Sequence, residues 1–209
     1  MTKRKRDFLS VLKKEDIKKE VIMAFEELDQ KYFFDKLFES YYYSNEPIPI
    51  GYGEKGDPSI ILAKMISCLA PDKSVRALEI GTGSGFSTAI LSKLFNEIIT
   101  VEFHENLALA AKDKLLNMGI GNVRFLTGDI TALDTLPGIF DRIIIFAACT
   151  DRPLFLIPYL KKGGVMVFPM GPAYQQQITI LKNEPAENGG LYKMFYYDLC
   201  NFNPLIGMA

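Results

Sequence analysis

The chain has few of the side chains that most often carry acid–base or metal chemistry. Its 209 residues include one histidine, His104, and three cysteines. Because His104 has no cysteine or histidine partner at ligand spacing, the sequence predicts no zinc site and disfavours a mechanism that depends on a histidine base. Cys68, Cys149 and Cys200 are odd in number, far apart and set among apolar residues, which favours reduced thiols over a disulfide or a metal site.

Long apolar runs are also missing. No stretch approaches the roughly 18 apolar residues of a membrane span. In the first 20 residues, charges interrupt the apolar positions every few residues, so the hydrophobic region of a secretory signal is lacking. We therefore expect a cytoplasmic protein that does not associate with membranes.

Positive charge is not in excess, because the formal net charge is −1. This balance gives no global attraction to nucleic acid. The first 20 residues do carry 8 Lys and Arg against 4 Asp and Glu. We interpret that segment as a solvent-exposed helix with a frayed start, in preference to a nucleic-acid-binding arm, and expect no nucleic-acid partner.

The N-terminal quarter of the sequence has a helical pattern followed by a loop. Apolar residues recur at helical spacing from Lys13 to Tyr43. Residues 44–59 contain three prolines and three glycines, which predicts an extended, turning loop. Asp57 and Pro58 are a plausible cap and first position for a helix that ends at Cys68. The length suits a single α/β unit, which we divide into an N-terminal helical extension with its loop (1–58) and a main domain (59–209).

From Pro71 onward, short apolar runs alternate with helical stretches, and this alternation predicts a parallel sheet with helices on both faces. The expected strands are 75–80, 97–103, 122–129, 140–148 and 165–170, and the expected helices are 85–95, 106–119 and 152–164. Strands at 176–182 and 192–202, joined by a turn at 187–190, would end the sheet as an antiparallel hairpin. The fold class is therefore α/β, doubly wound and Rossmann-like.

Three glycines follow the first strand of this sheet, in the segment "ALEIGTGSGFS" at residues 77–87. Ligands of open parallel sheets bind beyond the carboxyl ends of the strands, and glycine lets the backbone approach them closely. Gly81, Gly83 and Gly85 are spaced GxGxG, whereas a dinucleotide fingerprint is GxGxxG and would need glycine at Phe86. The turn therefore does not favour a pyrophosphate.

Acids end the next two expected strands. Glu102 lies where a carboxylate can accept hydrogen bonds from both hydroxyls of a ribose, and Asp129, after Gly128, lies where it can accept one from an adenine amino group. Either acid alone would more often be a solvated loop residue or a helix cap. A ribose and an adenine without a pyrophosphate clamp describe S-adenosylmethionine.

Several segments together resemble the protein-L-isoaspartate O-methyltransferase family. They are "PIPIGYG", "LEIGTGSGFSTAILSKL", "VEFHENLALAAKDKL", "NVRFLTGD", "FDRIIIFAA", "LKKGGVMVFPMGP" and "FNPLIG", in that order from about residue 20 to the end. The resemblance implies a class I methyltransferase fold with S-adenosylmethionine as the methyl donor. It implies a protein or peptide substrate, whose L-isoaspartyl carboxylate is methylated in the repair of damaged proteins.

The resemblance also implies site residues. Those expected at the cofactor are Glu79, Gly81, Thr82, Gly83, Ser84, Gly85, Glu102, Phe103, Gly128 and Asp129, and those expected on the acceptor side are Tyr52, Asp57, Ala148, Cys149, Pro169, Gly171 and Gln177. The acceptor half departs from the family pattern. Asp57 stands where the family has a serine, Ile130 replaces a glycine, and Tyr174 and Gln175 replace paired glycines.

An isoaspartyl carboxylate needs little acid–base help, because it is already ionised at neutral pH. The protein has to align it with the methyl group and exclude water, which a chain with one histidine can do. Cys149 is then a filler of the pocket rather than a nucleophile. Three alternatives remain: the same fold and donor with another acceptor, a non-catalytic module that binds a partner through its basic N-terminus, and a nicotinamide oxidoreductase.

Overall fold

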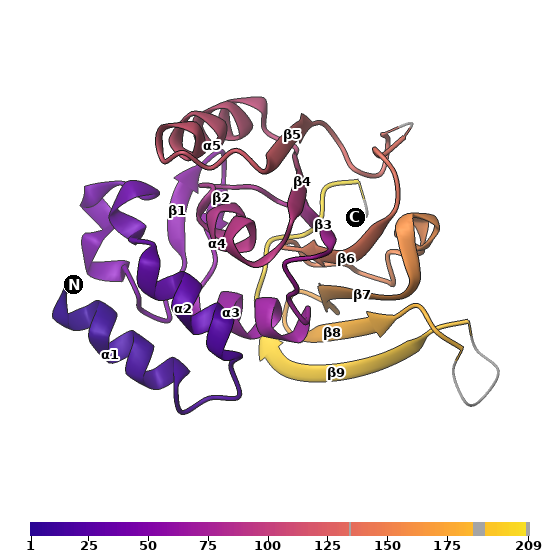
Figure 1. Cartoon of the computed structure of the whole chain (residues 1–209), viewed down its shortest axis with the longest axis horizontal. Helices are drawn as coiled ribbons and strands as arrows, with labels where there is room; N and C mark the ends of the chain where they lie inside the picture. The colour runs from indigo at the N-terminus through magenta and orange to yellow at the C-terminus, as the bar shows by residue number, and fades with distance from the viewer. Residues whose placement is uncertain (134, 186–190, 208–209) are drawn as a thin grey trace.

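A seven-stranded sheet forms the centre of the molecule in the computed structural model, which describes residues 1–133, 135–185 and 191–207 (Figure 1). The strands lie in the order β5-β4-β3-β6-β7-β8-β9. Their bounds are β3 (Arg76–Ile80), β4 (Glu97–Glu102), β5 (Val123–Thr127), β6 (Phe140–Ile145), β7 (Leu160–Met170), β8 (Gln176–Lys182) and β9 (Lys193–Cys200). Strands β3 to β7 are mutually parallel, whereas β8 and β9 each run antiparallel to the strand before them. The predicted fold class is confirmed; the turn predicted at 187–190 lies outside the described residues.

Five α-helices and three 3₁₀ helices accompany the sheet in the described part of the chain. They are α1 (Lys3–Leu12), α2 (Lys19–Glu27), η1 (Gln30–Tyr32), η2 (Lys36–Tyr41), α3 (Ser59–Cys68), α4 (Phe86–Leu94), α5 (Glu105–Asn117) and η3 (Leu154–Tyr159). Residues from all five α-helices enter one apolar cluster on one face of the sheet. The cluster on the other face is closed by connecting segments and by Leu156 of η3. We expected helices on both faces; the second face has only this short one among the described residues.

Helix α1 packs into the core, which corrects the expectation of a solvent-exposed helix at the N-terminus. Phe8, Leu9 and Leu12 are buried, and they join the same apolar cluster as residues of α2, α3 and α4. Because Leu12 lies four residues after Phe8 and three after Leu9, these side chains share one face of α1, while the exposed side carries Lys3, Arg4 and Arg6. The charge pattern alone hid this apolar face.

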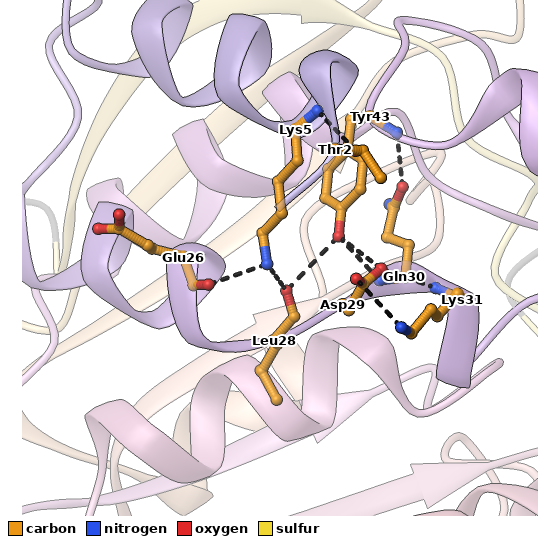
Figure 2. A network of polar contacts seen from close by, with 8 residues as sticks. All are labelled: Thr2, Lys5, Glu26, Leu28, Asp29, Gln30, Lys31 and Tyr43. Carbon is orange, nitrogen blue, oxygen red and sulfur yellow. Dashed lines mark hydrogen bonds and ion pairs between the residues drawn. The ribbon is translucent and has the colours of Figure 1, made fainter.

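A buried polar network ties α1 to the segment ahead of α3 (Figure 2). Lys5 Nζ donates to the backbone carbonyls of Glu26, at 2.8 Å, and of Leu28, and burial lowers the pKa of Lys5. The Gln30 side chain accepts from the Tyr43 backbone N–H at 2.6 Å and donates to Ser59 Oγ at 2.8 Å. Since unmade hydrogen bonds of buried groups are costly, this network fixes the start of α3 relative to the N-terminal helices.

A β-hairpin at residues 48–56 lies within the segment 44–59, so the expectation that this segment is a loop without regular elements is wrong. Strand β1 (Ile48–Gly51) pairs antiparallel with β2 (Glu54–Gly56). The turn between them needs positive φ at Gly51, Tyr52 and Gly53, which two glycines make possible. The same glycines and prolines that suggested a loop therefore form the turn and the edge of a two-stranded ribbon.

The helix expected at 152–164 is also wrong. Residues Leu154–Tyr159 form the 3₁₀ helix η3, and the chain is already part of strand β7 from Leu160 onward. Pro158 lacks a backbone N–H and so cannot continue an α-helical ladder. The two glycines that suggested a helix end, Gly163 and Gly164, lie inside β7.

No helix among the described residues is long and apolar enough to cross a membrane.

Candidate active site

The turn between β3 and α4 forms the floor of a cleft at the carboxyl ends of the parallel strands. Its empty volume, counted out to the open mouth and including open solvent, is about 890 Å³. Gly81, Thr82, Gly83 and Ser84 line it. Gly83 has a φ of +52°, and a Cβ built there would meet only Ile50 Cδ1, at 3.1 Å. A side chain at this position would therefore enter the cleft.

Gly85 serves packing instead. It has a φ of +87° and occupies the N-cap position of α4. A Cβ built on it would lie 2.9 Å from Leu115 and 3.1 Å from Ala111, both on α5. Gly85 does not line the cleft. Glycine is required here by the close approach of α4 and α5.

The Glu102 carboxylate is held at the edge of this floor. It accepts from the Gly83 backbone N–H at 2.8 Å and from the His104 backbone N–H at 3.0 Å. The side chain lines the cleft and is only 5% exposed. A carboxylate has about four acceptor sites, so two remain for a ligand. Phe103, the next residue, also lines the cleft.

Glu79 lies behind the floor and does not line the cleft. Its carboxylate is fully buried and accepts from Ser87 Oγ and Thr88 Oγ1, each at 2.6 Å, and from Thr100 Oγ1 at 2.7 Å. The Thr82 and Thr100 hydroxyl oxygens are 2.6 Å apart. Because Thr100 donates its one hydroxyl proton to Glu79, Thr82 donates to Thr100. Burial raises the pKa of Glu79 to about 7, against the lowering effect of the three hydroxyls.

Asp129 and the C-terminal segment form a second wall. Asp129 Oδ1 accepts from the Thr131 backbone N–H at 2.8 Å and from Thr131 Oγ1 at 2.7 Å, which fixes the carboxylate. Gly128 and Asp129 both line the cleft. Residues 204–206, which the sequence did not predict as site residues, line it as well. A Cβ on Gly207 would lie 2.8 Å from both Asp129 carboxylate oxygens, so the C-terminal segment runs directly against this acid.

The β1–β2 hairpin forms the opposite wall, with Ile50, Glu54, Lys55, Gly56 and Asp57 lining the cleft. Hydrogen bonds from Asn106 and Asn203 hold it to the two rims. Asn106 Nδ2 donates to the Tyr52 hydroxyl at 2.8 Å, and Asn203 Nδ2 donates to Glu54 Oε2 at 2.8 Å. Tyr52 itself lies outside the cleft lining and is 57% exposed.

The imidazole ring of His104, two residues after Glu102, contacts this hairpin. It lines the cleft, stacks on Tyr52 with ring centroids 5.2 Å apart, and its Nε2 lies 3.6 Å from Glu54 Oε1. Nε2 is buried without a hydrogen-bond partner among the described residues. The only sequence signal for His104 was its place two residues after Glu102.

Asp57 faces the cleft rather than capping α3. The cap position of α3 is Pro58, and no side chain caps this helix end, so the capping expectation is wrong. Burial raises the pKa of Asp57 well above its ordinary value of 3.8; the charge of Lys55 lowers it, and Glu54 raises it further. A carboxyl group with an unfavourable ionised form therefore lies on the hairpin side of the cleft.

The other residues predicted on the acceptor side do not line the cleft: Ala148, Cys149, Pro169, Gly171 and Gln177. After β6, the residues that line it are Phe146 and Ala147. Ala148 and Cys149 are buried, and burial raises the pKa of the Cys149 thiol to about 12, so it is not a thiolate nucleophile. The Cys149 backbone N–H donates to the Pro169 carbonyl at 2.9 Å, and the Gly171 N–H donates to the Cys149 carbonyl at 3.1 Å. Gln177 is in β8, opposite Leu199.

Among the described residues, no group of three or more His, Cys, Asp or Glu side chains is arranged to hold a metal ion.

Comparison with known proteins identifies the family. The family model for protein-L-isoaspartate(D-aspartate) O-methyltransferase (PCMT) matches residues 3–207. The protein-L-isoaspartate O-methyltransferase of Dictyoglomus thermophilum is 40% identical over 169 residues, which are 80% of this chain and 77% of that protein. The enzyme of the same name from Sodalis glossinidius is 34% identical over 204 residues, which are 97% of this chain and 96% of that protein.

A solved structure agrees on the fold. A Plasmodium falciparum chain crystallised with S-adenosyl-L-homocysteine superposes with a TM-score of 0.80 over 98% of this chain and 99% of that one, at 18% identity. This superposition shows a shared fold, and the sequence matches show the family. This chain belongs to the protein-L-isoaspartate O-methyltransferase family.

Proposed function

We propose that this protein transfers the methyl group of S-adenosylmethionine to the carboxylate of L-isoaspartyl residues in damaged proteins. The observation that carries the proposal is one cleft with two different walls. The glycine turn, Glu102 and Asp129 form the cofactor side, and the hairpin with Asp57 forms the acceptor side. Membership of the family supports both the donor and the reaction.

The residues present fit the cofactor. Gly83 leaves free the space that a Cβ would fill, and Glu102 is fixed by two backbone N–H groups with two acceptor sites to spare. We assign Glu102 to the ribose hydroxyls, Asp129 with Gly128 to the adenine, and the turn from Gly81 to Ser84 to the methionine part. Phe103 would pack beside the adenine. Bound S-adenosylmethionine supplies a methyl group on a sulfonium, which is an excellent leaving group.

The protein's own contribution is alignment and exclusion of water. The acceptor carboxylate is ionised at neutral pH and needs no base. Phe34, Ile50 and Leu62 add apolar side chains to the lining, which keep water from the reacting atoms. Orientation of two reactants in this way can supply several kcal/mol of the barrier reduction, on the order of 7–11 kcal/mol in the best cases.

Glu79 and Gly85 take indirect roles in this proposal. Glu79 positions Thr82 through Thr100, and Gly85 sets the approach of α4 to α5. Tyr52 holds the hairpin through Asn106. Ala148, Cys149, Pro169, Gly171 and Gln177 support the floor and rim on the acceptor side.

We further propose that the protein acts in the cytoplasm on protein or peptide substrates and has no nucleic-acid partner. Three basic residues of α1, Lys3, Arg4 and Arg6, lie on the exposed side of a packed helix, and Lys5 is buried, which supports this view. Residues 1–58 and 59–209 would act as one structural unit, since the hairpin of the first supplies a wall of the site.

The test is a methyl-transfer assay with labelled S-adenosylmethionine and two peptides that differ only in an isoaspartyl or an aspartyl residue. We expect label in the isoaspartyl peptide alone, as a base-labile ester. Binding of S-adenosylhomocysteine is measured in parallel by calorimetry. Binding without transfer to either peptide would reject isoaspartyl methylation and favour another acceptor.

Asp57→Ser should raise the catalytic efficiency for the isoaspartyl peptide by about tenfold or more. An ionised Asp57 about 5 Å from the acceptor carboxylate would repel it by roughly 3 kcal/mol at an effective dielectric constant near 20. Because the pKa of Asp57 is raised, the carboxyl is neutral at low pH and ionises as pH rises, so the gain should grow with pH. Steady-state kinetics across a pH series measure it.

Asp57→Asn is the matched control, since it removes the charge and keeps the shape. It should show the same pH-dependent gain. If neither variant gains activity while the wild type turns over well, Asp57 does not face the acceptor carboxylate.

A further inference from the structure

We propose that Lys55 binds the carboxylate of the methyl acceptor and thereby selects anionic acceptors; this inference rests on the function proposed above. Lys55 stands in the middle of β2, between Glu54 and Gly56, and lines the cleft. None of the roles assigned so far uses it.

The cleft lining is rich in acidic residues and poor in basic ones. Four acidic residues line the cleft: Glu54, Asp57, Glu102 and Asp129. Among the described lining residues, Lys55 is the only lysine or arginine. A carboxylate that enters this cleft is repelled by each acid that is ionised unless a cation offsets the repulsion. Lys55 is the basic residue placed to do so.

The Lys55 ammonium group is available to bind a ligand. Most of the polar groups around it are engaged: Glu54 with Asn203, Glu102 with two backbone N–H groups, and Asp129 with Thr131. In the described part of the chain, no carboxylate oxygen lies within 4.0 Å of Lys55 Nζ, and no hydrogen bond engages its side chain. Its charge nevertheless lowers the pKa of Asp57, so it acts on the same side of the cleft.

The anchoring of the strand is a further argument. Pro49 lies opposite Lys55 in the hairpin, and the preceding residue, Glu54, is bonded to the C-terminal rim through Asn203. On the other side, Gly56 packs against Phe34, because a Cβ there would lie 2.5 Å from that ring. The backbone of Lys55 is therefore held on both sides, while its long side chain can adjust to an incoming carboxylate.

The experiment compares Lys55→Met, which keeps the length without the charge, with Lys55→Arg, which keeps the charge. Lys112→Met, an exposed position on α5 away from the cleft, is the control for loss of one positive charge. Each variant is assayed with the isoaspartyl peptide at low and at moderate ionic strength, and binding of S-adenosylhomocysteine is measured by calorimetry.

We expect Lys55→Met to raise KM for the peptide by about tenfold or more, with kcat changed by less than about threefold. Its KM should also lose most of the salt dependence of the wild type. Lys55→Arg should keep KM within about threefold, and Lys112→Met should behave as wild type. The affinity for S-adenosylhomocysteine should be the same in all four proteins.

Two results would overturn the inference alone. One is a KM for Lys55→Met within about twofold of an active wild type. The other is an equal loss of S-adenosylhomocysteine affinity, which would assign Lys55 to the carboxylate of the cofactor. A wild type that binds S-adenosylhomocysteine but methylates no isoaspartyl peptide would instead overturn the proposed function, and this inference with it.

Discussion

Gly83→Val should leave no measurable affinity for S-adenosylmethionine or S-adenosylhomocysteine, in a chain that still folds. The residue has a φ of +52°, and a Cβ added to it meets only Ile50 Cδ1 of the hairpin. The branched side chain would fill the space between the glycine turn and the hairpin and would force the hairpin outward. It would also disturb the Gly83 N–H that fixes the Glu102 carboxylate. Calorimetry with S-adenosylhomocysteine measures the loss.

Gly119→Val is the matched control, because it separates backbone strain from blockage of the cleft. Gly119 has a φ of +72° with open space around its α-carbon, and it follows the C-cap of α5 outside the cleft lining. A β-branched residue in the left-handed region costs roughly 1–3 kcal/mol at either position. Both variants should therefore melt at similarly lowered temperatures, and only Gly83→Val should lose binding. Binding retained within threefold would show that the turn does not face the cofactor.

The alternating half of the fold could be predicted from the sequence because each element has its own local signal. The strand before Gly81 and the strand ending at Glu102 are short β-branched or apolar runs, and α5 ends at a left-handed glycine, Gly119. These elements were confirmed. The positions of Glu102 and Asp129 at the cleft followed from the same alternation, since parallel strands end at one edge of the sheet.

The hairpin could not be predicted, because its signals are ambiguous and its support is tertiary. Gly51, Gly53 and Pro49 suit a loop as well as a tight turn. The hairpin is held as a wall of the site by residues far away along the chain. Asn106 bonds to Tyr52 across 54 residues, and Asn203 bonds to Glu54 across 149 residues. For the same reason the interpretation of the N-terminal basic segment was wrong: Lys5 is buried because two carbonyls at the C-terminal end of α2, those of Glu26 and Leu28, accept from it.

Two residues that were predicted at the cofactor, Glu79 and Gly85, lie outside the cleft lining. Glu79 and Gly85 belong to the glycine turn in sequence, and so were grouped with the cofactor residues. In the structure Glu79 points to the side of the sheet covered by α4, and Gly85 faces α5. A strand alternates its side chains between the two faces, so neighbours of a site residue need not touch the ligand.

The buried Glu79 carboxyl, which accepts three hydrogen bonds, makes the free energy of unfolding depend on pH. Burial raises the pKa of its carboxyl from 4.5 to about 7. In the unfolded chain the group ionises near its ordinary value, so below that pH it is protonated in both states and contributes fully. As pH rises from about 4.5 to about 7, the unfolded chain releases the proton first, and the folded state loses stability. The two values correspond to a loss of about 3 kcal/mol.

Glu79→Gln should remove this dependence, because the amide is neutral and the hydroxyls of Ser87, Thr88 and Thr100 can either donate to it or accept from it. The free energy of unfolding is measured by urea denaturation in a pH series, and the variant's value is subtracted from that of the wild type. Contributions from Asp57 and the other titrating groups cancel in this difference. We expect it to fall by about 3 kcal/mol between about pH 4.5 and about pH 8. A difference that stays constant with pH would mean that Glu79 keeps its ordinary pKa in the folded chain, and that its three hydroxyl donors compensate fully for its burial.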